Sequence, residues 1–284
     1  MNNAKIKNPK PKNYNPIICT PYTVWSIIFI IVPLFMVAYY AFTDKTGAFT
    51  FDNIAELPRY AKTFGISLVY SVEATIICLI IAYPLAYFMS NMKAGPKRML
   101  SMLIMLPMWM NFLIRTYSWI TILARTGIIN TLLEKIGIGP LKLINTPGAI
   151  ILGMVYNFLP YMVLPIYTAM LKLDHSLLEA ADDLGASPFM RLRKVILPLS
   201  MPGVISGITM VFVPCVSTFY ISQKLGGGKT MLIGDVIEMQ FQSAYNYNLG
   251  AAISLILMVL ILISLAVMNH FADKDEEEGG GLII

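Results

Sequence analysis

The sequence is poor in the side chains on which enzyme chemistry depends. Charged residues make up 13% of its 284 residues, and histidine occurs twice, as His175 and His270. General acid–base catalysis and metal sites need convergent histidine, cysteine or carboxylate groups, and no such grouping is visible. The run Gly226–Thr230 lacks the G-x-x-x-x-G-K-[ST] spacing that binds nucleotide phosphates. We therefore expect no catalytic residue, no metal site, no bound cofactor and no ATP hydrolysis by this chain.

Cysteine is also scarce. Cys19, Cys78 and Cys215 lie in or beside apolar segments and lack the spacing of metal ligands. Such cysteines usually serve as small core side chains, which we expect here in place of disulfides. The sequence has no repeat of solenoid period and no polar linker that would divide it into two domains.

Apolar residues, by contrast, are abundant. They account for 57% of the chain, against roughly 45–50% in soluble domains, and the mean hydropathy is +0.67. The net charge is +5, but the basic residues form short clusters beside apolar segments. That placement is typical of a membrane topology signal and not of a nucleic-acid-binding face. The composition therefore predicts a membrane protein that contacts lipid and binds no nucleic acid.

Six segments approach the roughly 20 apolar residues that a helix needs to cross a membrane. They are predicted at about 23–42, 66–90, 99–123, 148–171, 203–222 and 250–269. The first segment is too long for a signal-peptide core and lacks an obvious cleavage site, so we expect it to be retained. The fold class is therefore predicted to be an all-α polytopic membrane protein. Its parts are an N-terminal segment (1–22), a six-helix transmembrane domain (23–270) and an acidic tail (271–284).

Lysine and arginine are distributed unevenly between the two sides of the predicted bundle. The side that holds both termini carries twelve of these residues, and the opposite loops carry eight. Positively charged segments favour the cytoplasmic side of a membrane. We therefore expect both termini and the loop 172–202 to face the cytoplasm, in a plasma membrane.

Two charged residues, Glu73 and Arg115, fall within the predicted spans, in the outer half of the membrane. A charge at membrane depth is costly and indicates a function by default. Either side chain could instead extend toward the outer headgroups, which is easier for the longer Arg115. Glu73 is therefore the stronger candidate for a buried role, either paired with Arg115 or facing a transport pathway.

The loop between the fourth and fifth spans carries the signals of a short first helix. Ser176 and Glu179 have the spacing of a capping box, in which each side chain accepts a backbone hydrogen bond at the helix start. Gly185 follows the apolar stripe at the position of a left-handed C-cap. The sequence thus predicts a helix that starts at Ser176 and stops at Gly185.

A second short helix is predicted directly afterwards. Ser187 and Pro188 have the character of an N-cap and a first helical residue. Pro198 lacks a backbone N–H and is expected to end this helix. The loop is therefore predicted to be a helix–turn–helix at the membrane surface.

The same loop resembles the signature loop of ABC importer permeases. That motif is E-A-A-x-x-x-G, nine residues, an aliphatic residue, one more residue and L-P. The matching residues are Glu179, Ala180, Ala181, Gly185, Val195, Leu197 and Pro198. The one departure is Val195, where the family usually has isoleucine. The resemblance implies a type I ABC importer permease fold, with this loop as a coupling helix that docks into a cytoplasmic ATPase subunit.

Several side chains of the loop suit such docking. Ala180 and Ala181 are small, so a partner surface could approach the helix backbone closely. Leu184 and Phe189 offer apolar anchors on either side of the turn. Glu179 is better placed to cap its own helix, although a contact with a basic residue of the ATPase stays open.

Three further segments resemble the first permease subunit of spermidine/putrescine ABC importers. They are residues 82–87, 106–119 and 225–234. The resemblance implies a second homologous permease, two ATPase subunits and an extracytoplasmic binding protein, with polyamine moved inward by alternating access. It assigns no role to Asp235 or Glu238.

Two alternatives to polyamine import stay open. An ABC importer permease for another small solute, such as thiosulfate, an iron chelate or a phosphonate, would carry the same signature loop. A secondary transporter should show inverted repeats and several ionisable groups within the membrane. The sequence shows no such repeat and only one glutamate and one arginine within its spans.

Overall fold

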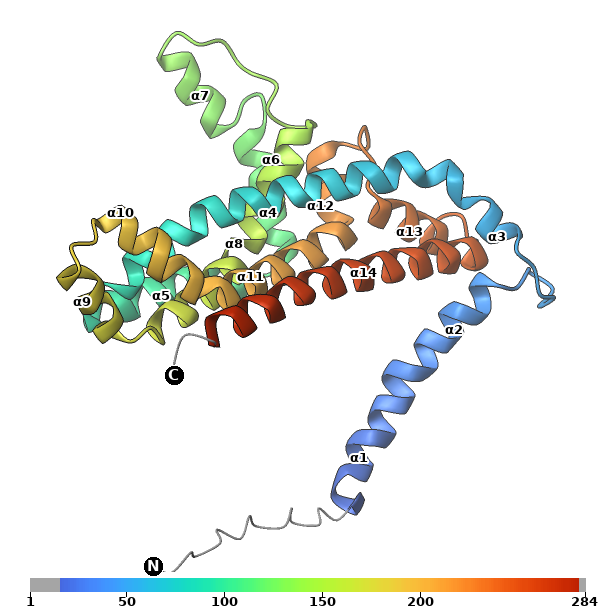
Figure 1. The fold of residues 1–284 in the computed structure, drawn as a ribbon. Coiled ribbons are helices and arrows are strands. Elements are labelled where there is room, and N and C mark those ends of the chain that lie inside the picture. Colours follow the sequence, from blue (N-terminus) through green and yellow to red (C-terminus); the bar gives the residue numbers. More distant parts are fainter. Residues whose placement is uncertain (1–15, 281–284) are drawn as a thin grey trace, which may run out of the picture.

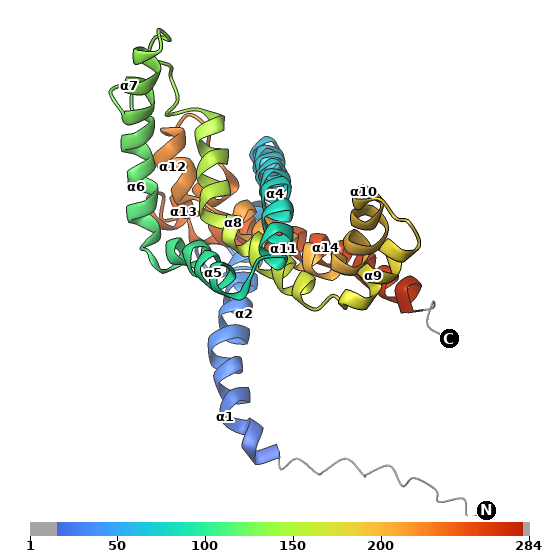
Figure 2. The ribbon, with the colours of Figure 1, turned by 90° about the vertical axis from the view of Figure 1, so that its left-hand side faces the viewer.

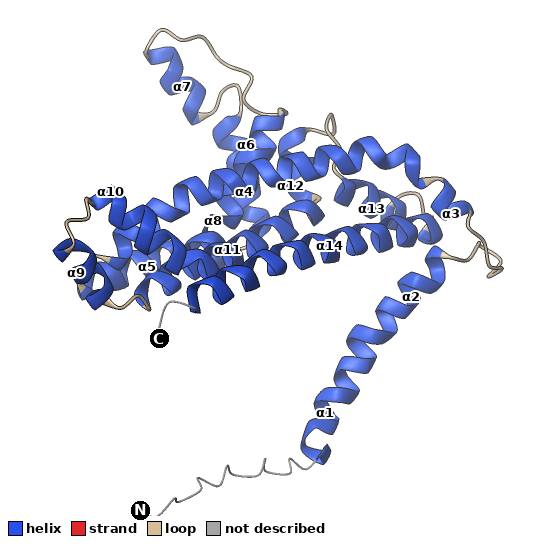
Figure 3. Ribbon diagram, viewed as in Figure 1, coloured by secondary structure: helices blue, strands red, loops and turns tan. Residues whose placement is uncertain are grey.

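The computed structural model describes residues 16–280, apart from the side chains of 16–19, 175 and 269–280. Within that range the regular structure is helical, and the only β-type pairing is an isolated bridge between Thr43 and Phe49 (Figure 3). The prediction of an all-α fold is confirmed. The predicted segment 1–22 lies partly outside the described residues, as do the last four residues of the predicted tail.

Figure 1 shows the helices in chain order, with the longest loops between them at 42–51 and 136–146. They are α1 (Pro16–Ser26), α2 (Val32–Ala41), α3 (Asp52–Ala55), α4 (Ala61–Ser90), α5 (Ala94–Trp109), α6 (Phe112–Leu123), α7 (Ile128–Lys135), α8 (Pro147–Leu171), α9 (His175–Asp183), α10 (Pro188–Arg191), α11 (Leu197–Ser217), α12 (Tyr220–Gly226), α13 (Ile233–Gln242) and α14 (Tyr247–Gly280). Two π-helical turns (Ile27–Ile31 and Leu192–Ile196) and one 3₁₀ turn (Leu57–Tyr60) complete the set.

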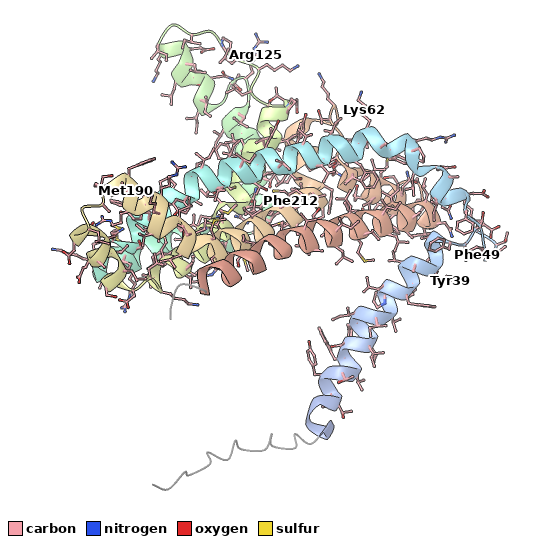
Figure 4. The ribbon with its side chains drawn as sticks, viewed as in Figure 1. Tyr39, Phe49, Lys62, Arg125, Met190 and Phe212 are labelled. Carbon is pink, nitrogen blue, oxygen red and sulfur yellow. The ribbon has the colours of Figure 1, made fainter. Side chains whose placement is uncertain are left out.

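Helices α4, α8 and α11 form the centre of the bundle, and α14 lies along α11 (Figures 1 and 2). Their contact surfaces hold apolar side chains with almost no exposure, among them Cys78, Met154, Ile166 and Cys215. The prediction that Cys78 and Cys215 are core residues is therefore confirmed, whereas the side chain of Cys19 is not described. Phe212 of α11 belongs to a second apolar cluster that α4, α13 and α14 complete (Figure 4).

Among the described residues, five helical segments are long and apolar enough to cross a membrane. They are Thr20–Ala41, Asp52–Ser90, Pro147–Leu171, Pro188–Ser217 and Tyr247–Met268. The fourth predicted span matches α8 to within one residue. The fifth ends earlier than predicted, because Thr218 is extended and stops α11. The backbone helix α14 runs on to Gly280, so most of the predicted tail prolongs the last span.

The third predicted span is not one straight helix. Helix α5 and the segment α6–α7 meet at an angle of 94°, so they form either a bent sixth span or a re-entrant segment. Met110 is extended, and the Asn111 side chain caps α6 by accepting a hydrogen bond from the Leu113 backbone N–H at 2.8 Å. Pro107 lies in the last turn of α5. The break therefore has a local cause in sequence, and the count of spans is five or six.

The prediction that Pro198 ends the second short helix is wrong. Residues Leu192–Ile196 form a π-helical turn, in which Leu197 donates its backbone N–H to the carbonyl five residues earlier. A widened turn accommodates a proline ring that would clash with the carbonyl four residues before it. Helix α10 is thereby continuous with α11, as Pro188–Ser217. The same kind of turn precedes Pro33.

The segment α1–α2 projects away from the rest of the molecule (Figures 1 and 2). It begins at Pro16, seven residues before the predicted first span. Its C-terminal part meets the bundle, where Ala41, with Val37 beside it, packs against Ala251 and Ala252 of α14. The Asn248 side chain fixes this junction by donating hydrogen bonds to the carbonyls of Tyr40 at 3.1 Å and Thr43 at 2.7 Å.

Candidate functional site: the hairpin between α8 and α11

Helices α9 and α10 form a hairpin at the end of the bundle where α14 ends (Figures 1 and 2). Met190 of α10 marks this end in Figure 4. The hairpin, the π-helical turn that follows it and the first two residues of α11 together contain all the residues that the sequence assigns to a coupling loop.

Helix α9 starts earlier than predicted. Asp174 is the N-cap, and its carboxylate accepts a hydrogen bond from the Ser176 backbone N–H at 3.0 Å. The expected capping box of Ser176 and Glu179 is therefore wrong, because aspartate caps a helix as well as serine and stands two residues upstream. Glu179 is exposed, and no hydrogen bond of its carboxylate is found among the described side chains. That carboxylate remains available to a partner.

Gly185 ends α9 in the conformation that the sequence predicts. Its φ is +76°, in the left-handed region. Its N–H donates to the Asp182 carbonyl at 2.9 Å, and the Ala186 N–H donates to the Ala181 carbonyl at 3.0 Å. These two bonds constitute a Schellman motif. The predicted C-cap is confirmed, and it fixes the direction in which the chain enters α10.

The second helix also starts as predicted. Ser187 is the N-cap and accepts a hydrogen bond from the Met190 backbone N–H at 3.3 Å, with Pro188 as the first helical residue. An ion pair between Arg191 and Asp182, 2.6 Å from Nη1 to Oδ2, joins α10 to α9 across the turn. This pair was not predicted from the sequence. Because both side chains are partly exposed to solvent, the pair contributes little to stability, and its main effect is on the orientation of α10 relative to α9.

The two faces of the hairpin differ sharply. On the inner face, Ile196 is 2% exposed and Ala181 is 9% exposed. The partly buried residues Leu173, Leu178 and Leu192 pack against the bundle core. On the outer face, Leu184 is 89% exposed and Phe189 is 70% exposed. Large apolar side chains at such exposure on a rigid, capped turn are suited to insert into a partner surface.

The remaining residues of the sequence motif are spread over both sides. Ala180, Leu197 and Pro198 are exposed, and Val195 is half-buried.

A groove of about 830 Å³ runs beside the hairpin between α8 and α11. Asp174 and Leu177 of the hairpin line one end of this groove, and Tyr161, Ser206 and Met210 line its other parts. The hairpin thus presents an apolar tip next to an open groove.

The structure does not bring the two predicted in-span charges together as an ion pair. Arg115 is buried in α6, 7% exposed, with its guanidinium carbon 5.9 Å from the Phe112 ring centroid. Its Nε and Nη1 have no hydrogen-bond partner among the described residues. Glu73 is exposed on α4. The only ion pair between described side chains is the one in the hairpin.

A polar pocket at the opposite end of the molecule contains a buried carboxylate. Asp235, in the first turn of α13, is 3% exposed and accepts hydrogen bonds from the Leu232 N–H at 2.7 Å and the Ser222 hydroxyl at 2.9 Å. The pKa of Asp235 is raised from 3.8 to about 6, mainly because the carboxylate is buried; the hydrogen bonds from Leu232 and Ser222 oppose this shift, and the nearby Glu238 carboxylate adds slightly to it. The Gln223 amide donates to Glu238 at 2.9 Å. The pocket has a volume of about 190 Å³.

The raised pKa of Asp235 predicts a pH-dependent stability. The folded chain binds this proton more tightly than the unfolded chain, so the contribution is complete below pH 3.8 and is lost as pH rises through about 6. We expect the thermal midpoint of the purified protein to fall across that interval. Asp235→Asn should flatten the profile, whereas the exposed control Asp52→Asn should leave it unchanged. An unaltered slope in Asp235→Asn would assign the pH dependence to another group.

The family model described as "binding-protein-dependent transport system inner membrane component" matches residues 82–274. The spermidine/putrescine transport system permease protein PotB of Haemophilus influenzae is 42% identical over 253 residues, which cover 86% of this chain and 88% of that protein. PotB of Escherichia coli K12 is 37% identical over 253 residues, 86% of this chain and 92% of that protein. The residues matched by the family model include the whole hairpin.

Solved structures give the same fold at low sequence identity. A bacterial alginate ABC transporter in complex with its periplasmic protein has a chain with a TM-score of 0.75 and 16% identity, covering 91% of this chain and 93% of that chain. An inward-facing MetNI methionine ABC transporter gives a TM-score of 0.56 and 17% identity, covering 74% and 93%. These likenesses confirm the predicted permease fold.

Proposed function

The chain belongs to the family of binding-protein-dependent transport system inner membrane components, and from this membership we propose that it carries spermidine or putrescine across the membrane. As a permease subunit of an ABC importer, it forms part of a multi-pass assembly in the plasma membrane. The observation that carries the polyamine proposal is the 42% identity to a spermidine/putrescine permease over most of both chains. The three polyamine-permease-like segments of the sequence agree with it.

The proposed energy source is ATP hydrolysis by partner subunits. The capped hairpin, with Leu184 and Phe189 exposed at its tip, would dock into a cytoplasmic ATPase subunit. Ala180 would allow close approach, and Glu179 would be free to meet a basic residue. A binding protein would deliver the cargo from the outside. A second homologous permease would complete the translocation pathway, and alternating access would move the cargo inward.

This proposal is tested on the intact complex with its binding protein. ATPase activity is measured with putrescine, spermidine, thiosulfate, an iron chelate and a phosphonate. We expect stimulation by one or both polyamines and none by the anions. Stimulation by an anion alone would replace the polyamine assignment while keeping the importer assignment, and hydrolysis independent of loaded binding protein would contradict both.

The orientation of the chain is proposed from its lysine and arginine distribution. A cysteine introduced at Ser187, in the hairpin, should react only with membrane-permeant maleimides in intact cells. One at Asn53, beyond the opposite end of α4, should react with impermeant reagents. The buried Cys78 and Cys215 are protected from both. Labelling of position 187 by an impermeant reagent would reverse the proposed topology.

Glu73 is proposed to face the transport pathway. Its neighbours on the exposed side of α4, Val69, Val72 and Ile76, are aliphatic, and a carboxylate facing lipid among them would be costly. We expect Glu73→Gln to reduce polyamine uptake while the complex assembles normally, and the control Glu56→Gln, outside α4, to transport normally. Arg115→Leu is measured in the same two assays. If the complex of this variant fails to assemble, and does not simply assemble and fail to transport, Arg115 has a packing role. Normal uptake kinetics in Glu73→Gln would remove Glu73 from the pathway.

A further inference from the structure

A lysine lies against two tyrosine rings where α6 meets α12. The Lys224 ammonium is 5.6 Å from the ring centroid of Tyr117 and 5.6 Å from that of Tyr220. The two rings are 6.3 Å apart and inclined by 76°, so their faces and edges form a corner around the cation. Both distances are within the range at which a ring face attracts a cation.

The corner lies where two long helices are interrupted. Tyr220 is the first residue of α12, just after α11 stops at Thr218, and Tyr117 is in α6, shortly after the 94° bend. Helices α6 and α12 lie side by side in both ribbon views (Figures 1 and 2). Non-helical backbone at membrane depth is tolerated where it is buried in protein or lines a water-filled cavity. Tyr117 is 50% exposed, so its ring can be reached from outside the chain.

The ammonium of Lys224 has the two tyrosine side chains as neighbours, and no described carboxylate forms an ion pair with it. Within residues 16–280, the only ion pair between described side chains joins Arg191 to Asp182. Phe112 extends the aromatic surface, with its ring 5.9 Å from that of Tyr220, and Arg115 borders it on the far side. Because Arg115 adds a second positive charge, the corner is suited to one cationic group and not to a closely spaced series of them.

The occupant of this corner has a definite chemistry. A lysine side chain is a chain of four methylenes that ends in a primary ammonium, and the end of a linear alkylamine presents the same groups. We propose that Tyr117 and Tyr220 form a binding site for the primary ammonium end of an alkylamine, and that Lys224 occupies this site until such a ligand displaces it. The identification of that ligand as the transported polyamine rests on the function proposed above.

A tethered competitor weakens the binding of a free ligand. A group on a short flexible chain acts at an effective concentration of roughly millimolar, so Lys224 would oppose micromolar cargo strongly. Removing its charge while keeping its length should therefore expose the site. From the range of cation–π energies, we expect alkylammonium occupancy to rise about twofold to thirtyfold in Lys224→Met.

The test uses native membranes that contain the full-length chain and its copurifying subunits. The probe is a butylamine that carries a photoreactive diazirine, and the readout is the amount of probe on peptides containing Tyr117 or Tyr220. Wild-type protein should be labelled weakly and Lys224→Met strongly. Excess n-butylammonium should compete, and the neutral 1-butanol should not.

Matched variants separate the site from general effects of charge. Lys229→Met removes an exposed lysine from the same connection between α11 and α14, and it should be labelled as weakly as wild type. In the Lys224→Met background, Tyr117→Phe keeps the ring and should retain labelling. Tyr117→Leu and Tyr220→Leu remove a ring and should abolish it.

Labelling that is equal in wild type and Lys224→Met would overturn the proposal, as would equal competition by 1-butanol or persistence of labelling in both leucine variants. Copurification of the ATPase subunits establishes that each variant is assembled, so a misfolded variant is recognised. Because the readout is labelling, it does not depend on transport. Polyamine-stimulated ATPase activity without the labelling pattern would reject only this site, and the labelling pattern without polyamine stimulation would reject only the polyamine assignment.

Discussion

Replacing Gly185 with valine is expected to lower transport by roughly fivefold to thirtyfold while the membrane helices fold normally. Gly185 has a φ of +76°, and this left-handed region costs an L-residue with a β-carbon about 1–2 kcal/mol. A cost of that size lowers the population of the observed turn by about fivefold to thirtyfold, and we expect transport to fall in proportion. No atom lies within 4 Å of the position that a β-carbon would occupy. The effect is therefore one of backbone conformation alone, and it would re-aim α10 together with the exposed tip of the hairpin.

Two matched variants make this experiment specific. Asparagine tolerates the left-handed region better than other residues with a β-carbon, so Gly185→Asn should transport nearly as well as wild type. Gly185→Ala should lie between asparagine and valine. The measurements are uptake in cells and the quantity of ATPase subunit that copurifies with the permease. Wild-type transport and full ATPase retention in Gly185→Val would remove the hairpin from the coupling mechanism.

The parts of the hairpin that the sequence predicted are those with a local cause. A glycine after an apolar stripe and a serine followed by proline specify a C-cap and an N-cap through their own backbone preferences, and both predictions are confirmed. The predicted capping box failed because Asp174 competes for the same role two residues upstream. Aspartate and serine are both favoured N-cap residues, so the local sequence alone does not decide whether Asp174 or Ser176 starts the helix.

Proline behaves differently at two positions of the structure, and this difference explains the error at Pro198. Pro198 was expected to stop a helix, and the structure instead shows a π-helical turn that absorbs it. Near Pro107, by contrast, the helix does break, and Asn111 caps the new one. A proline is kept inside a helical segment when the surrounding packing favours continuation of the helix. Here the side chain of Ile196, two residues before Pro198, is buried in the core. That packing is a property of the folded bundle and not of the local sequence.

The aromatic corner around Lys224 lay beyond sequence reasoning for a similar reason. Tyr117 and Lys224 are separated by more than 100 residues, and although Tyr117 lies in the segment 106–119 that resembles polyamine permeases, no motif links it to Lys224. Their proximity follows from the bend between α5 and α6 and from the end of α11 at Thr218. Glu73 and Arg115 are the opposite case. The sequence placed both charges at a similar depth in the membrane and so suggested an ion pair, but no ion pair between them is found among the described side chains.

Substitution of Gly203 by alanine is expected to destabilise the whole bundle. A β-carbon at Gly203 of α11 would lie 2.5 Å from the Ala169 β-carbon and 2.8 Å from the Pro165 carbonyl oxygen of α8. The carbonyl is backbone, so it cannot turn away as a flexible side chain could, and the two helices would have to separate. Overpacking of this kind typically costs about 1–3 kcal/mol, and we expect a lower thermal midpoint and less protein in the membrane.

The local sequence gives no reason to single out this glycine among the 19 in the chain. Pro202 and Gly203 together are typical of a turn, yet they lie inside α11, where the absent β-carbon allows α8 to approach. Gly65 provides the matched control, because it is exposed in α4 and a β-carbon there would meet nothing within 4 Å. Alanine is favoured over glycine in a helix by up to about 1 kcal/mol, so Gly65→Ala should be neutral or stabilising. Equal thermal midpoints for Gly203→Ala and Gly65→Ala would show that α8 and α11 do not depend on this close approach.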